Sequence, residues 1–439
     1  MILALLFALS QDSSRLTLET AVSRALSRYP QVAAAHAARE HAAADLGESR
    51  AALLPRLTLD GNLTHYQKPG LVFPLHSLPT GPGSALPLFD NNLVQGSLTA
   101  SWTLWDFGQR SSRIRAARLS ASAADASVDS VEQAVIARTA AGYLAVLTAR
   151  GVLAAQDERL AALAAESSRT NQVLAAGKAA RIDLLRVTAE LERARADRIA
   201  TASRVDVAER DLAQLVDLPI DSIHRGALAG LGLLDTTLAT RDSLMAAARA
   251  ASPALLQAHQ RAQAAAANAG IARGTRFPEL RLQGRYLDFG RTAGDFESEW
   301  QAGVLVTWPL FTGGARSSQI SRSDADARAA QAQAALAELA VAGSLDRTLA
   351  SLREARARTA ALEQAVAQSA EVVHIERLSL DVGSGTQSDF LEAEANLLSA
   401  RASLVEARHA AITARVDLAR ITGELSPEWL RRTLVEQQP

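Results

Sequence analysis

The hydrophobic positions of this chain follow two different spacings. Four segments alternate residue by residue between apolar and polar side chains, a pattern typical of strands with one apolar face. They cover residues 56–67, 93–105, 279–289 and 300–311. Elsewhere apolar residues recur at helical spacings over much longer stretches, which predicts long helices. The pattern as a whole therefore predicts a mainly α chain with four strands.

The polar faces of the predicted strands carry side chains suited to water. Hydroxyl, amide and guanidinium groups make up this face in the second and third strands. Its members are Gln95, Ser97, Thr99, Ser101, Thr103, Arg281, Gln283 and Arg285. We predict that these residues line the water-filled lumen of a barrel.

Aromatic residues stand near the ends of the apolar faces, where a membrane interface would favour them. They are Trp102, Trp105, Tyr286, Trp300 and Trp308. Eight residues at about 3.3 Å each, tilted by about 40°, rise roughly 20 Å, close to the apolar band of an outer-membrane barrel. Four strands cannot close such a barrel, so other copies of the chain must supply the rest. For any single strand, a half-buried sheet of a soluble protein is the alternative.

The second half of the chain repeats the first. The segment from Trp102 to Trp105 recurs from Trp308 to Phe311, 206 positions later, and the spacing then holds for more than a hundred residues. This indicates one duplicated structural unit. Long helices are predicted over 110–176, 182–216, 316–382 and 388–422. The longer ones would reach about 100 Å, and the return helices keep the a/d heptads of a coiled coil.

These patterns predict a division of the chain. The predicted parts are a signal peptide (1–10), a first repeat (11–217), a linker or equatorial segment (218–238), a second repeat (239–423) and a C-terminal tail (424–439). The signal is short and lacks a basic residue before its apolar run, so we interpret it as truncated; a buried N-terminal segment is the alternative. No other stretch approaches the roughly 20 apolar residues of a membrane-spanning helix.

Composition narrows the function. Hydrophobic residues make up 48% of the 439, but alanine is the commonest of them and aromatics make up only 4% of the chain, which favours long packed helices over a compact core. A formal charge of -1 gives no general attraction to nucleic acid. The absence of cysteine excludes disulfides, thiolate catalysis and cysteine-ligated zinc. No phosphate-binding loop, metalloprotease motif or nucleophile with a base at a recognisable spacing occurs, so we predict neither a catalytic site nor a cofactor.

The order of these elements resembles the TolC-type outer-membrane efflux proteins. The resemblance rests on the duplicated layout, on corners at Asp106 to Gly108 and Thr312 to Gly314, and on two helical tips with a Gly and, six residues later, an Asp. It implies a homotrimer with a twelve-stranded barrel in outer-membrane lipid and a helical tunnel in the periplasm of a Gram-negative bacterium. It also implies two partners, a periplasmic adaptor (membrane fusion protein) and an inner-membrane transporter that supplies the energy.

The same resemblance implies roles for the helical tips. Asp389 and Glu392 match the carboxylates that constrict the tunnel entrance, and they share a helix face because they are three residues apart. A periplasmic gate or selectivity ring made of Asp389, Glu392 and Asp183 is therefore expected; solvated helix charges without a role are the alternative. The residues expected to dock the adaptor are Gly177, Lys178, Arg181, Gly383, Ser384 and Gly385.

The closed state needs a different latch in this chain. The Tyr and Arg that latch it in the family correspond here to Leu380 and Gly385. Asp183 with Lys178 and Arg181 is a candidate replacement.

Two classes of function follow from the sequence. The first is a passive exit duct of a tripartite efflux or type I secretion system. The second is a soluble periplasmic coiled-coil scaffold or adaptor, with the strands as a small cap domain. Strands that are polar on one face, apolar on the other and end in Trp favour the duct, and so does the long Pro-rich loop of the first hairpin.

Overall fold

The computed structural model describes residues 16–73, 76, 88–178, 180–234 and 239–437. The predicted signal peptide lies outside these residues, as does most of the Pro-rich loop. The chain forms two compact units, one built from residues 38–125 and 257–335 and the other from residues 1–37, 126–256 and 336–439. The two longest helices contribute to both units, and each unit is described by itself.

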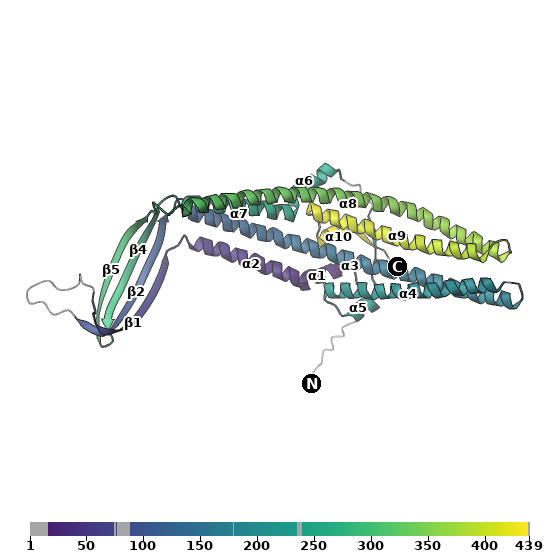
Figure 1. Cartoon of the computed structure of the whole chain (residues 1–439), viewed down its shortest axis with the longest axis horizontal. Coiled ribbons are helices and arrows are strands. Elements are labelled where there is room, and N and C mark those ends of the chain that lie inside the picture. Colours follow the sequence, from purple (N-terminus) through teal and green to yellow (C-terminus); the bar gives the residue numbers. More distant parts are fainter. Residues whose placement is uncertain (1–15, 74–75, 77–87, 179, 235–238, 438–439) are drawn as a thin grey trace, which may run out of the picture. The chain divides into compact units, whose positions relative to one another are not determined.

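The first unit contains a four-stranded antiparallel sheet with the order β1-β2-β4-β5 (Figure 1). Its strands are β1 (Arg56–Leu71), β2 (Phe89–Trp105), β4 (Glu279–Arg291) and β5 (Gly294–Thr307). Two helices lead into the sheet, α2 (Pro30–Ala51) and α7 (Pro253–Gly274). Each begins with a proline, which is favourable there because the first residue of a helix has no intrahelical acceptor for a backbone N–H. The strand predicted to reach residue 311 ends at Thr307, because Pro309 has no N–H to continue a ladder.

The strand register places apolar residues opposite apolar residues and polar residues opposite polar ones. Leu57 lies opposite Ala100 and Leu59 opposite Leu98, while Thr58 lies opposite Thr99. Across the next pair, Trp102 lies opposite Leu282. Because the side-chain period of a strand is two, this register carries one apolar and one polar face across all four strands.

The second unit consists mainly of helices (Figure 1). Its longest members are the C-terminal parts of α3 (Gln109–Ala175) and α8 (Ala315–Asp381), with the return helices α4 (Arg181–Val216) and α9 (Gln387–Thr422). The first and last residues predicted for these four helices are each within one residue of the observed ones.

Shorter elements complete the unit: α1 (Leu18–Arg28), α5 (Ile220–Arg225), β3 (Gly230–Leu233), α6 (Arg241–Ala251), α10 (Pro427–Thr433) and β6 (Leu434–Gln437).

The linker and tail contain structure that the sequence patterns did not predict. β3 lies in the predicted linker and β6 in the predicted tail, and they pair as a separate antiparallel ladder. Helices α5 and α10 flank this ladder in sequence. A strand of four residues and a helix of six or seven are too short to establish a period, which is why the alternation test missed them.

The main core of the helical unit surrounds this small ladder. Tyr143 of α3 is fully buried, and its single hydroxyl hydrogen is shared between the carbonyl oxygens of Leu16 (2.8 Å) and Ala229 (3.0 Å). Apolar residues of α1, α3, α4, α9 and α10 pack in the same cluster, including Leu212, Ile412 and Trp429. The linker and tail therefore fasten the helices together.

The duplication is visible in the backbone. Four pairs of residues separated by 206 positions all have positive φ angles. They are Phe107 and Gly313, Gly108 and Gly314, Gly177 and Gly383, and Asp217 and Gly423. The same left-handed turns thus connect strand to helix and end the long helices in both halves.

Candidate functional site

The apolar face of the sheet is exposed along its length. Leu59 is 80% exposed, Leu63 67%, Val304 59% and Val306 62%. Monomeric soluble proteins rarely expose contiguous apolar patches of more than a few hundred Å². This face is therefore a surface for an apolar medium or partner.

Aromatic residues frame this face. Trp102 and Trp308 occupy equivalent positions in the two halves, and their indole N–H groups donate to the carbonyl oxygens of Leu53 (2.8 Å) and Arg276 (3.1 Å). Tyr286 lies opposite Trp300 on the neighbouring strand, and Trp300 is 75% exposed. An apolar ring with a satisfied polar atom suits the boundary between lipid and water.

Trp105 reaches the apolar face through a β-bulge. Alternation alone would put it on the polar face, but the register shifts between Thr103 and Trp105, so that Trp105 lies opposite Leu280. The ring of Trp105 contacts the ring of Phe107 edge to face, and the Phe107 ring stacks on the Phe277 ring with 4.9 Å between their centroids. A bulge that re-aims one side chain is a common device at the end of a barrel strand.

The residues predicted for the lumen share one face. The hydroxyl of Thr103 donates to Glu279 Oε1 (3.1 Å), Arg281 donates to the same oxygen (2.8 Å), and Arg285 donates to Ser97 Oγ (3.4 Å). Gln95 and Gln283 lie on this face and are exposed, whereas Thr99 and Ser101 are half-buried. The sheet is thus amphipathic across its full width.

The two helical tips pack side by side in the second unit (Figure 1). One apolar cluster joins the start of α4 to the start of α9, where Phe390 is almost fully buried. The other buried residues of this cluster are Leu163, Val187, Leu191, Ala194 and Leu391. Leu380 packs against this cluster and so contributes to the core of the tips.

Of the predicted gate carboxylates, Asp183 and Asp389 lie in the first turns of α4 and α9, and Glu392 lies in the next turn of α9. Asp183 accepts a hydrogen bond from the N–H of Ala180 (3.2 Å), and Asp389 accepts one from the hydroxyl of Thr386 (2.7 Å). A carboxylate there favourably offsets the positive end of the helix dipole. Asp389 and Glu392 are both exposed, so capping leaves the Asp389 charge accessible to solvent.

The residues predicted to dock a partner form the tip turns. Gly177, Lys178, Arg181, Gly383 and Ser384 are exposed, and Gly385 is half-buried. A Cβ atom on Gly385 would lie 2.9 Å from Ser379 Cβ. A side chain at this position of the second tip would therefore require Ser379 to move.

An ionic link between α3 and α8 was missed by the sequence analysis. Arg169 donates to the buried Glu166 (3.1 Å) and to Asp381 (3.0 Å), the last residue of α8. Arg169 and Asp381 are 212 positions apart, so no local sequence pattern relates them. Nearby, burial raises the pKa of Glu394, although Arg377 (3.9 Å) opposes this.

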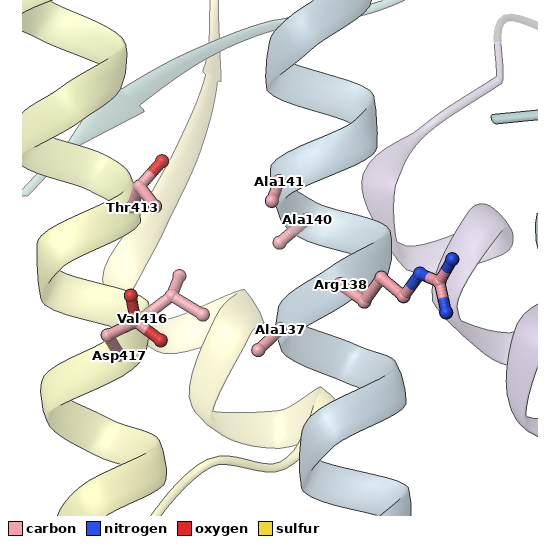
Figure 2. Close-up of a pocket in the computed structure, with 7 residues that line it drawn as sticks. All are labelled: Ala137, Arg138, Ala140, Ala141, Thr413, Val416 and Asp417. Atoms are coloured by element: carbon pink, nitrogen blue, oxygen red, sulfur yellow. The ribbon is translucent and has the colours of Figure 1, made fainter. Parts of the chain in front are cut away.

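A small hollow lies between α3 and α9 (Figure 2). Ala137, Ala140 and Ala141 face Thr413 and Val416 across it, while the guanidinium of Arg138 points away and meets the hydroxyl of Tyr29 (2.9 Å). Small residues bring the two helices close together, and the hollow offers too few polar groups to orient a ligand.

No helix among the described residues is long and apolar enough to cross a membrane. No group of three or more His, Asp or Glu side chains among them is arranged to hold a metal ion.

An amphipathic sheet with aromatic borders, joined to long helical hairpins with paired tips, defines an outer-membrane channel of the efflux class. The model of the outer membrane efflux protein family matches residues 21–217 and 244–424. The chain belongs to this family and is an outer-membrane efflux protein.

Individual relatives agree with the family match. The chain is 24% identical to the outer membrane protein TolC of Vibrio cholerae over 414 residues, which cover 91% of this chain and 89% of that protein. It is 32% identical to the protein CyaE of Bordetella pertussis over 285 residues, 61% of this chain and 57% of CyaE.

Solved structures share the fold. The outer membrane protein VceC of Vibrio cholerae matches with a TM-score of 0.77 at 20% identity, covering 92% of this chain and 96% of VceC. A membrane protein from Pseudomonas aeruginosa matches with a TM-score of 0.80 at 22% identity, covering 92% and 93% of the two chains. These matches confirm the predicted fold class.

Proposed function

We propose that this protein is the passive exit duct of a tripartite efflux or type I secretion system. In this role three chains close a barrel in the outer membrane and a helical tunnel in the periplasm. A periplasmic adaptor contacts the helical tips, and an inner-membrane transporter supplies the cargo and the energy. Family membership and the similarity to TolC and CyaE support this proposal.

The observation that carries the proposal is the two-faced sheet with unpaired edges. β1 and β5 are the outermost strands of its order, so each has one side without a partner strand in the described part of the chain. A sheet edge cannot stay unpaired in the hydrocarbon of a bilayer. Pairing β5 of one chain with β1 of the next satisfies both edges, and three chains of four strands close a ring.

The helices also offer a surface to a second copy. An exposed apolar stripe runs along the C-terminal part of α8 at helical spacing, through Val372, Ile375 and Leu378, and Val382 just after the helix extends it. Ile182 and Leu185 at the start of α4 are also more than half exposed. Long helices with such stripes bury them in coiled-coil packing, which supports assembly through the helices as well as the strands.

Within this duct, Asp389 and Glu392 are assigned to a carboxylate ring at the tunnel entrance. Three copies bring like charges together, and such a ring favours cations over anions. We predict that an Asp389→Asn, Glu392→Gln variant loses several-fold in cation-over-anion permeability. Reversal potentials across a KCl gradient in planar bilayers measure this ratio, with Glu424→Gln, away from the tips, as control. An unchanged ratio would leave these carboxylates as solvated helix charges.

The contact between Arg169 and Asp381 is assigned to the closed state of the tips. It ties the first hairpin to the second, a task for which the sequence suggested Asp183, Lys178 and Arg181. We predict that Arg169→Gln raises single-channel conductance several-fold, because the hairpins separate once the link is gone. Arg195→Gln, which removes an exposed ion pair within α4, is the matched control. Equal conductance of both variants and the wild type would contradict this assignment.

Fractionation and bilayer recording test the function as a whole. The proposal predicts that the protein stays in the outer-membrane fraction until detergent is added, and that the purified trimer forms channels. Release into the periplasmic fraction without detergent would instead support the soluble scaffold.

A further inference from the structure

The charged residues on the polar face of the sheet are sorted along the strands. Glu279 stands in the first row at the end of the sheet joined to the helices. Arg281, Arg56 and Arg285 belong to the three rows that follow it. Asp60 and Glu299 share the next row, and Glu297 lies in the row after that. Positive charge thus predominates near the helix end of this face, with three arginines against one glutamate, and negative charge lies beyond it.

Local partners leave most of this separation intact. Arg281 is paired with Glu279, and Glu299 lies 2.9 Å from His76. Arg285 has only the hydroxyl of Ser97. Arg56 has no ion pair or hydrogen bond from its side chain within the described ranges, and it is exposed. The uncompensated charge is therefore positive near the helices.

Further out, the sorting ends at an ion pair. Arg291 occupies the same face beyond Glu297 and pairs with Asp295. The charges of this pair offset each other, so it leaves the two sorted regions unchanged.

A hollow of about 970 Å³ opens on this face at the helix end. Arg56, Thr103 and Arg281 line it from the strands, so a solute can reach these side chains. Helix α2 contributes Asp45 and Glu48 to its wall, α3 contributes Arg110 and Arg113, and Asp106 and Glu279 line it as well. Arg110 is paired with Asp106 (2.9 Å). The lining thus holds four arginines and four carboxylates, and Arg285, further along the same face, gives the inner region an excess of one positive charge per chain.

We propose that the barrel lumen is bipolar: an inner arginine belt of Arg56, Arg281 and Arg285 selects for anionic groups, and an outer acidic belt lies in series with it. The acidic belt consists of Asp60, Glu297 and Glu299. The inference rests on the proposed trimeric duct, in which the polar face lines the lumen and each belt is present three times. The expected ligands of the inner belt are carboxylate or phosphate groups of passing solutes and small inorganic anions.

The dimensions give the belts influence over the whole lumen. Twelve strands about 4.8 Å apart and tilted by about 40° form a barrel about 24 Å across between backbones. Arginine side chains reduce the open diameter of the lumen. The Debye length, over which salt screens a charge, is about 10 Å at 0.1 M salt. The field of each belt therefore reaches the axis at low salt and is screened at 1 M, where that length is about 3 Å.

Two opposite belts in series make the current depend on its direction. Anions gather in the inner belt and cations in the outer one. When the extracellular side is positive, both kinds of ion are driven toward the junction of the belts and the conductance rises. When it is negative, both are drawn away and the conductance falls.

Planar-bilayer recording of the whole trimer, inserted from one side, tests the proposal. At equal and opposite voltages in 0.05 M KCl we expect currents that differ about twofold, and nearly equal currents in 1 M KCl. The triple variant R56Q/R281Q/R285Q should abolish the difference at low salt, and R56K/R281K/R285K should keep it. The variant E424Q, which changes neither belt and lies away from the tips, should keep it too.

Symmetric wild-type currents at low salt would overturn the bipolar lumen, and so would a difference that survives the triple Gln variant. Conversion of heat-treated trimer to monomer on a gel shows whether each variant has assembled. A wild-type protein that forms no channels would contradict the duct itself, and the belts with it.

Discussion

A Leu59→Arg substitution is expected to prevent the protein from accumulating in the outer membrane. Leu59 is 80% exposed in the middle of the apolar face, opposite Leu98. An arginine at the midplane of a bilayer on the lipid face of a barrel costs about 2–4 kcal/mol, and a trimer carries three. The measurement is the amount of heat-modifiable trimer in the outer-membrane fraction.

The neighbouring position provides the control for this substitution. Thr58 lies on the polar face, opposite Thr99, so a Thr58→Arg variant places the same side chain in water. We expect that variant to assemble at near wild-type levels. Equal assembly of the Leu59 and Thr58 variants would show that the two faces of the sheet do not meet different media.

An Arg150→Met substitution is expected to cause a large loss of stability. Arg150 of α3 reaches Glu209 (2.7 Å), whose side chain is 2% exposed, and donates to the carbonyl oxygens of Gly226 (3.0 Å) and Ile223 (2.6 Å). Removing the arginine leaves a buried carboxylate with only His224 beside it. Breaking a buried pair in this way costs about 3–5 kcal/mol.

Thermal unfolding followed by circular dichroism measures this loss. Arg225→Met is the matched control, because Arg225 pairs with Asp221 on the surface, where both side chains are more than 70% exposed. An exposed pair of this kind contributes about 0–1 kcal/mol. Similar melting temperatures for the two variants would mean that Arg150 does not hold the linker against α3 and α4.

The local patterns of the sequence predicted most of the fold. Strict alternation located the four strands because each strand has one apolar face and spans enough residues to establish a period of two. The offset of 206 positions located the equivalent turns, of which Gly177 and Gly383 have φ angles of 74° and 77°. Asp217 adopts the same turn (φ 52°) although it is not a glycine. Nothing in its local sequence indicates the turn, which is signalled only by its duplicate, Gly423.

The features that the sequence did not reveal depend on contacts between distant residues. The β3–β6 ladder joins segments about 200 positions apart, and each strand has four residues. The bulge that turns Trp105 to the apolar face breaks the alternation used to find its strand. The links from Arg169 to Asp381 and from Arg150 to Glu209 join ordinary helix charges, which have no distinguishing spacing. The candidate gate residues were found only because a resemblance to a family pointed to their positions.

Cysteine accessibility across residues 57–64 tests the central claim most directly, namely that this protein forms an outer-membrane duct with one wet and one lipid-facing surface. The chain contains no cysteine, so each single-cysteine variant reports one position. In intact outer membranes, a water-soluble maleimide should label positions 58, 60, 62 and 64 and spare 57, 59 and 63. Uniform labelling of both sets, or the reverse alternation, would contradict the account.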